Sequence, residues 1–385
     1  MLLIKGAVPE ILIKDGRIVE IADSIAETGD MIVLDATGFV IAPGLVDIHV
    51  HFREPGFEYK EDIITGAMAA AAGGVTTCCC MANTMPVADS PEVIKYIIDK
   101  AAKAAVKVLP IGAVTYGLKG TELTDFAALK KAGAVALSDD GMPIVSDEMM
   151  RQALIAAEKE NLIIISHCEE EAPMVERDVR LAAETGAKIH IAHVSTADAV
   201  ETIRKAKAAG VKVTAETCPH YFSLTKATVE VKGTNAKMSP SLRTERDVEA
   251  IIEGLCDGTI DAIVTDHAPH SEEEKALPLD KAPNGIIGLE TMLATTLTYL
   301  YDTGKLSLER LVELMTKESA DILGLDAGVL KVGGVADIVI FDPNKEWVVD
   351  STQFKSKARN TPYGGMKLKG KVKYTISYGE VVYKA

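Results

Sequence analysis

The chain has 385 residues, 48% hydrophobic and 25% charged, which is typical of a globular protein and excludes a largely disordered one. Its formal net charge of −15 at pH 7 argues against nucleic acid and anionic membranes as partners, because both need a basic docking surface. No signal peptide or run of about 18 apolar residues is apparent. The six cysteines lack the spacing of a metal site, so we expect a cytoplasmic protein with reduced thiols.

The middle of the chain, residues 44–335, alternates between short β-rich runs and helical patterns. The eight predicted strands lie at 44–51, 74–83, 106–115, 134–141, 162–170, 188–196, 211–220 and 261–270. The predicted helices between them include 91–105, 146–160, 169–187 and 195–210. This alternation indicates parallel βα units, and eight such units close into a (β/α)8 TIM-like barrel. A doubly wound open sheet fits less well, because no GxGxxG turn follows the first strand.

The two ends of the chain contain short β runs and turns without intervening helices. Residues 1–43 include ILIKDGRIVEI, whose central Asp-Gly predicts a β-hairpin. Residues 336–385 contain further short β runs. Neither end is long enough for a core of its own. We therefore expect residues 1–43 and 336–385 to form one composite β-sandwich domain beside a barrel domain of residues 44–335.

Histidine and aspartate residues stand at the ends of several predicted strands. The first strand ends in His49 and His51, which lie on one strand face because they are two residues apart. The others are Asp139 and Asp140 after the fourth strand, His167 after the fifth, His193 after the sixth and Asp266 after the eighth. The carboxyl ends of barrel strands meet at one mouth, and imidazoles with carboxylates suit zinc and similar ions. One His-x-His pair is a weak signal, but a series of strands that each end in His or Asp is hard to explain by packing.

Two further histidines are interpreted differently. His190 lies three residues before His193 and therefore faces the other side of its strand, which favours a structural role. His220 follows the seventh strand and is equally compatible with a place behind the metal site or with simple packing.

The reaction class follows from these residue types. A bound ion lowers the pKa of water to about 7 and polarises a carbonyl oxygen. A neighbouring carboxylate such as Asp266 can take the proton of the attacking water and pass it to a leaving nitrogen. The residues alone therefore indicate hydrolysis of an amide, or its reverse.

The motif series resembles that of the type I dihydroorotases, which belong to the amidohydrolase superfamily. The resemblance covers nearly the whole chain and rests on DIHVHFREPG (47–56), MANTMP (81–86), SDDG (138–141), SHCEE (166–170), HVST (193–196) and TDHAPHSEEEK (265–275). It implies reversible, metal-dependent hydrolysis of (S)-dihydroorotate to N-carbamoyl-L-aspartate, a step of de novo pyrimidine (UMP) biosynthesis. It also implies Zn²⁺, as one ion or two.

The resemblance assigns roles to individual residues. The implied metal ligands are His49, His51, Asp140, His167, His193 and Asp266. The family pattern favours Asp140 over Asp139 as the ligand that bridges two ions, although the sequence alone leaves both open. Asp266 would also be the catalytic acid and base. The implied substrate-binding residues are Arg53, Asn83 and His270 for the carboxylate, with Asn284 and Gly285 in the loop over the ring.

Two features depart from the family pattern. Ser239 stands where the family usually has an asparagine, which leaves substrate affinity open at this point. His167 and His193 are only 26 residues apart, whereas relatives commonly carry a longer insertion there. The pocket rim is therefore expected to be more open on that side.

Two alternative functions are weighed against the main hypothesis. The first is another cyclic amidase, namely a hydantoinase, dihydropyrimidinase or allantoinase, which the carboxylate-binding residues disfavour. The second is a catalytically silent dihydroorotase-like subunit, which the complete set of metal ligands disfavours. The expected partners are a second copy of the chain in a homodimer and, as a further possibility, aspartate transcarbamoylase. No nucleic acid or membrane partner is expected.

Overall fold

The computed structural model describes all 385 residues, and its centre is a closed barrel of parallel strands. The barrel has eight positions, which we call staves. Seven of them are regular strands, and the fourth is the single residue Leu137, which forms β-bridges to Gly112 and to Ile164. A bridge between Val50 and His267 joins the last stave to the first. The strands are β6 (Leu45–Val50), β7 (Val75–Cys80), β8 (Lys107–Pro110), β9 (Ile164–Ser166), β10 (Ile189–Ile191), β11 (Val213–Thr217) and β12 (Ala262–Ile263).

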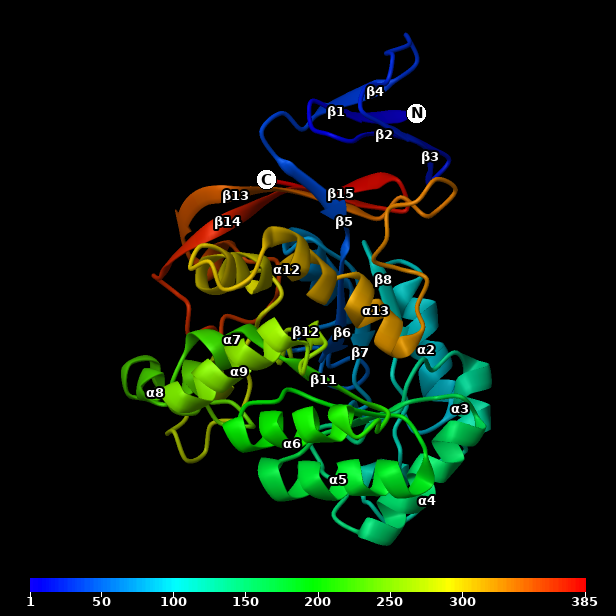
Figure 1. The fold of residues 1–385 in the computed structure, drawn as a ribbon, viewed down its shortest axis with the longest axis vertical. Helices are drawn as coiled ribbons and strands as arrows, with labels where there is room; N and C mark the ends of the chain where they lie inside the picture. The colour runs from blue at the N-terminus through cyan, green and yellow to red at the C-terminus, as the bar shows by residue number, and fades with distance from the viewer.

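Helices pack around the outside of this barrel (Figure 1). The helices are α1 (Ile63–Ala72), α2 (Pro91–Ala101), α3 (Phe126–Ala132), α4 (Asp147–Lys159), α5 (Glu171–Thr185), α6 (Ala197–Ala208), α7 (Pro219–Ser223), α8 (Ala227–Lys232), α9 (Glu245–Asp257), α10 (Glu272–Lys275), α11 (Met292–Thr296), α12 (Leu308–Leu314) and α13 (Lys317–Leu323). Three short 3₁₀ segments lie at Tyr116–Leu118, Gly233–Ala236 and Ser351–Gln353, and a π-helical turn follows α11 at Leu297–Tyr301. None of the helices is both long and apolar enough to cross a membrane.

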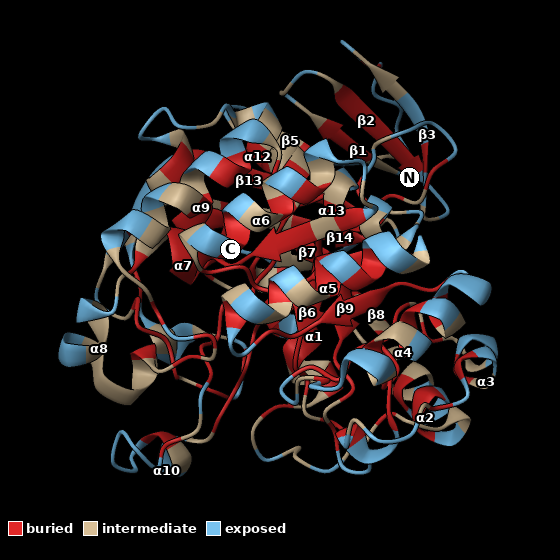
Figure 2. Ribbon diagram, turned by 60° about the horizontal axis from the view of Figure 1, so that its bottom comes forward, coloured by how far each residue is buried: buried red, intermediate tan, exposed pale blue.

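Helix α4 illustrates why these segments are helical. The hydroxyl of Ser146 accepts a hydrogen bond from the backbone N–H of Met149 and caps the first turn, which also carries two acidic residues. The buried positions Met150, Ala153, Leu154 and Ala157 follow the helical repeat and form one apolar face. Figure 2 shows the same pattern on the outer helices, whose buried side faces the strands.

The core follows the alternation of side chains along the strands. Ile164 of β9 belongs to a cluster of 64 buried residues that also includes Leu154 of α4 and Val179 of α5. Ile163 and Ile165 point the other way and belong to a second cluster of 23 buried residues. The predicted barrel is therefore confirmed, and the open-sheet alternative is wrong because the strand order closes on itself.

The two ends of the chain form two four-stranded sheets at one end of the molecule (Figure 1). Asp15 and Gly16 both have positive φ at the predicted hairpin turn, as a type I′ turn requires. Ten buried residues from both ends, including Ile11 and Ile338, form one apolar cluster. The sheets contain β1 (Leu2–Lys5), β2 (Glu10–Lys14), β3 (Arg17–Ala22) and β4 (Ile32–Asp35), and then β5 (Val40–Pro43), β13 (Ile338–Val348), β14 (Lys367–Ser377) and β15 (Glu380–Lys384). The division into domains at residues 43/44 and 335/336 stays a prediction.

Candidate metal centre and substrate pocket

The barrel brings the side chains expected as metal ligands together at the carboxyl ends of its staves. All six expected ligands are buried, and they come from five different staves. They are His49 in β6 and His51 just after it, Asp140 after the fourth stave, His167 after β9, His193 after β10 and Asp266 after β12. The barrel brings together residues that are far apart in the sequence: His51 Nε2 and Asp266 Oδ1 are 2.9 Å apart, although the two residues are separated by 215 positions.

Asp140 lies at the centre of the cluster. Its Oδ1 is 3.4 Å from His49 Nε2, 3.2 Å from His167 Nδ1 and 3.4 Å from His193 Nε2. Its Oδ2 is 3.3 Å from His51 Nε2. Asp266 Oδ1 approaches the other side of the cluster, 2.9 Å from His51 Nε2 and 3.5 Å from His49 Nε2. Asp140 therefore lies close to all four histidines, both the pair His49 and His51 and the pair His167 and His193.

These atoms fit a divalent metal. Donors of a tetrahedral ion with bonds of about 2.0 Å lie about 3.3 Å apart, close to the separations around Asp140. His49 Nε2 and Asp140 Oδ1 are buried without a hydrogen-bond partner, a state that a bound cation would relieve. Three groups of three residues satisfy the geometry of a metal site: His49, His51 and Asp140; His49, His193 and Asp266; and Asp140, His167 and His193.

The electrostatics of the cluster keep its carboxylates ionised. Burial alone would raise the pKa of Asp140, but the surrounding imidazoles outweigh burial and hold that pKa well below its ordinary value. The pKa of Asp266 is lowered for the same reason, mainly by His49 and His51. Burial opposes a proton on His49, but Glu216, Asp140 and Asp266 raise its pKa well above the ordinary value. A cation entering the metal-free site must therefore displace protons.

The structure separates the two neighbouring aspartates of the SDDG motif. Asp139 turns away from the cluster, and its Oδ1 accepts hydrogen bonds from the backbone N–H groups of Val114 and Thr115 at 2.7 and 3.0 Å. Asp139 thus ties the fourth stave to the segment after β8, while Asp140 faces the histidines. Of the two, Asp140 is the one that lies within the cluster, and its role as a bridging ligand stays a prediction.

Strained backbone marks three site residues. Arg53, His193 and Asp266 have φ angles of 62°, 36° and 46°, in the left-handed region that side chains with a Cβ rarely adopt. Such strain persists where the surrounding structure fixes the conformation, and it is commonly found at functional sites.

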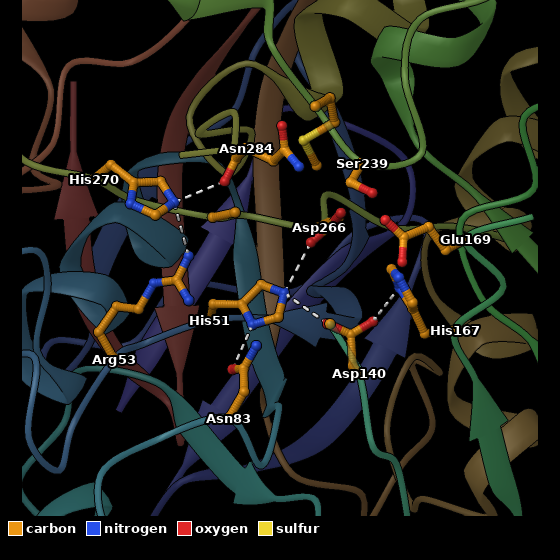
Figure 3. Close-up of a pocket in the computed structure, with 14 residues that line it drawn as sticks. His51, Arg53, Asn83, Asp140, His167, Glu169, Ser239, Asp266, His270 and Asn284 are labelled. Atoms are coloured by element: carbon orange, nitrogen blue, oxygen red, sulfur yellow. Dashed lines mark hydrogen bonds and ion pairs between the residues drawn. The ribbon is translucent and has the colours of Figure 1, made fainter. Parts of the chain in front are cut away.

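A cavity of about 220 Å³ opens over the cluster (Figure 3). All five residues expected to bind substrate line it, together with four of the expected metal ligands. The full lining is His51, Arg53, Asn83, Asp140, Gly141, His167, Glu169, Met238, Ser239, Asp266, Ala268, His270, Asn284 and Gly285. Only Met238 and Ala268 among them are hydrophobic, so the cavity suits a small polar molecule.

One wall of the cavity is cationic. Arg53 lies 3.4 Å from His270, whose Nε2 donates to the carbonyl oxygen of Asn284 at 2.8 Å. Burial, then the nearby Arg53 and Lys60, lower the pKa of His270 to about 3, so His270 is neutral at pH 7. Asn83 faces the same cavity, and its Oδ1 accepts from His51 Nδ1 at 2.9 Å. Arg53 is thus the cation that a carboxylate would meet here.

The loop 282–285 at the cavity edge is fixed through its carbonyl oxygens. Lys237 Nζ donates to the carbonyl of Ala282 at 2.6 Å. Lys275 Nζ donates to the carbonyls of Pro283 and Gly285, both at 3.0 Å. Lys275 is only 6% exposed, and burial, with Lys237 second, lowers its pKa to about 8. Two lysines therefore set the course of the loop that carries Asn284 and Gly285.

Two features of the site were missed from sequence. Glu216 of β11 lies beside His49, and its only sequence signal is a carboxylate within a predicted strand. Lys275 ends the segment SEEEK, which has the composition of a solvent-exposed helix. His190 and His220 are both buried, and His220 forms no hydrogen bond with the expected metal ligands.

The match to known proteins extends over the whole barrel. Residues 40–382 match the model of the amidohydrolase family. Dihydroorotases from Citrifermentans bemidjiense and Acetivibrio thermocellus are each 48% identical to this chain, over 98% of it and 95% of their own length. Among solved structures, the L-hydantoinase (dihydropyrimidinase) from Arthrobacter aurescens superposes with a TM-score of 0.90 at 27% identity, over 100% of this chain and 96% of its own. This chain therefore belongs to the dihydroorotase family of the amidohydrolases.

Proposed function

We propose that this chain hydrolyses the ring amide of (S)-dihydroorotate to N-carbamoyl-L-aspartate and also catalyses the reverse ring closure of pyrimidine biosynthesis. The observation that carries the proposal is one cavity that His51, His167, Asp140 and Asp266 of the cluster line together with Arg53. The floor suits hydrolysis of an amide, and the wall suits a substrate with a carboxylate.

The proposed cofactor is Zn²⁺, because imidazole and carboxylate ligands together suit zinc. The residues that would hold it are His49, His51, Asp140, His167, His193 and Asp266, and Asp140 would serve both ions if two bind. The central place of Asp140 supports two ions, since its two oxygens face different histidines. When bound, the metal would supply an activated water and polarise the carbonyl to be attacked.

The side chains of this chain bind and orient the substrate in the proposed mechanism. Arg53, Asn83 and His270 surround the place proposed for the substrate carboxylate, while Asn284 and Gly285 border the ring. The neutral His270 adds no charge, so the guanidinium of Arg53 supplies the attraction. Asp266 takes a proton from the attacking water and delivers it to the ring nitrogen as the amide bond breaks. The same steps in reverse close the ring.

The deciding experiment measures turnover of both dihydroorotate and N-carbamoyl-L-aspartate together with the metal content of the same sample. We expect activity in both directions, loss with a chelator and recovery with zinc. Hydantoin and dihydrouracil serve as controls for the other cyclic amidases, because neither carries a carboxylate. Turnover of these neutral rings without turnover of dihydroorotate would contradict the proposal.

A metal-loaded protein inert on every ring would instead support the silent-subunit alternative. A homodimer and an association with aspartate transcarbamoylase stay predictions, and so does a cytoplasmic location.

A further inference from the structure

A fully buried carboxylate lies directly behind the candidate metal centre. Glu216 Oε1 is 2.5 Å from His49 Nδ1, the ring nitrogen on the far side from the cluster. Its other oxygen, Oε2, is 3.1 Å from His190 Nε2. All three side chains have no exposed surface. Glu216 thus lies between a residue of the cluster and a histidine that the sequence favoured as structural.

The contacts of Glu216 connect three staves of the barrel. His49 comes from β6, His190 from β10 and Glu216 from β11. His190 is itself fixed, because its Nδ1 lies 2.8 Å from the hydroxyl of Thr214, two residues before Glu216 on the same strand face. The backbone carbonyl of Glu216 also accepts from Val194 N–H at 2.8 Å, next to His193. Glu216 therefore contacts His49 through its side chain and the residue after His193 through its backbone.

The two histidines of the His-x-His pair have unequal partners. Behind His51, the Nδ1 atom meets the neutral amide oxygen of Asn83. Behind His49, the Nδ1 atom meets the charged carboxylate of Glu216. A carboxylate at Nδ1 keeps the hydrogen on that nitrogen and leaves the lone pair of Nε2 directed at the metal. His49 Nε2 has no hydrogen-bond partner in the protein, in agreement with this arrangement.

Burying a carboxylate in a barrel interior is costly, so packing alone does not account for Glu216. We propose that Glu216, which lies between His49 and His190, is a positioning residue of the metal centre. It fixes the tautomer and orientation of His49 and makes its Nε2 a stronger donor. This inference rests on the proposed metal site, which it deepens by naming a residue that sets metal affinity without touching the metal.

The test compares Glu216→Gln and Glu216→Ala with Glu10→Gln as a matched control. Glu10 is also a buried carboxylate, but it accepts from the backbone N–H of Ile25 in the N-terminal sheet, far from the cluster. Zinc affinity is measured on folded protein by competition with a chromophoric chelator, and the visible spectrum of the Co²⁺-loaded protein reports ligand geometry. Circular dichroism confirms folding of each variant.

We expect Glu216→Ala to weaken zinc binding about 10- to 100-fold and to change the cobalt spectrum. Glu216→Gln should lose less, because its amide oxygen still accepts from Nδ1 but carries no charge. Glu10→Gln should match the wild type in both readouts. If Glu216 had only a structural role, its replacement would lower the stability of the protein but leave the zinc affinity and the cobalt spectrum of the folded protein unchanged.

The outcomes separate this inference from the proposed function. Wild-type metal affinity and an unchanged cobalt spectrum in both Glu216 variants would overturn the role of Glu216 alone. If Glu216→Ala does not fold, Glu216→Gln decides, since it preserves the size of the side chain. A wild-type protein that binds no metal would overturn the metal site and this inference with it.

Discussion

Asp266 has the position that a proton carrier needs. It lies at the floor of the cavity, and because His49 and His51 lower its pKa it is ionised, the state in which a carboxylate can accept a proton. We expect Asp266→Asn to retain substrate binding and metal while its kcat falls about 10²- to 10⁴-fold. Steady-state kinetics with metal analysis on the same sample would check this. Turnover near the wild-type level would show that another group moves the proton.

Arg53 is the residue whose loss should affect binding most. A hydrogen bond to a charged group contributes about 1.5–3 kcal/mol, so Arg53→Met should raise the KM for dihydroorotate roughly ten- to a hundredfold. The exposed Arg246 offers a matched control, since Arg246→Met also removes one positive charge from the protein. An unchanged KM in Arg53→Met would place the substrate carboxylate elsewhere in the cavity.

At the scale of elements, the loop 282–285 depends on a buried lysine. Lys275→Met removes the donors to the carbonyls of Pro283 and Gly285, so we expect KM to rise about tenfold or more as the loop shifts. Lys281→Met is the control, because Lys281 is exposed and lies next to the same loop. Equal KM values in the two variants would show that the loop keeps its course without Lys275.

Lys275 also gives the protein a characteristic dependence of stability on pH. Its pKa is about 8 in the folded protein, against an ordinary value of 10.5. Between these values the unfolded chain binds more protons, so the free energy of unfolding rises with pH through this window. The rise should be smaller in Lys275→Met, as measured by denaturant unfolding at pH 7.5 and pH 10. The same slope in both proteins would argue against a depressed pKa.

How much the sequence reveals depends on the range of the interaction. The strand ends and the spacing of His49 and His51 predict the cluster, because parallel staves bring their carboxyl ends to one rim. The choice between Asp139 and Asp140 stayed open from the residues alone, since it depends on which side chain reaches Thr115. Glu216 could not be predicted, because it lies within β11 and its sequence neighbours indicate only a strand, not the contact with His49.

At the scale of the whole molecule, metal removal should reduce stability. A ligand that binds only the folded state stabilises it by mass action, so chelator-treated protein should unfold at a lower temperature. Metal affinity should also fall on acidification, because the raised pKa of His49 means that protons compete for its ring. Calorimetry with and without zinc at pH 6 and pH 8 would measure both effects. Identical transitions with and without metal would contradict a buried structural contribution of the ion.

The closure of the barrel sets an order on how this site can form during folding. The bridge between Val50 and His267 joins the first stave to the last, and His51 and Asp266 stand beside that bridge on opposite sides of it. His49 and His51 are therefore synthesised long before Asp266. A nascent chain that lacks its final βα unit would hold the first two histidines without Asp266. The metal can therefore bind with full affinity only after the last strand has closed the barrel.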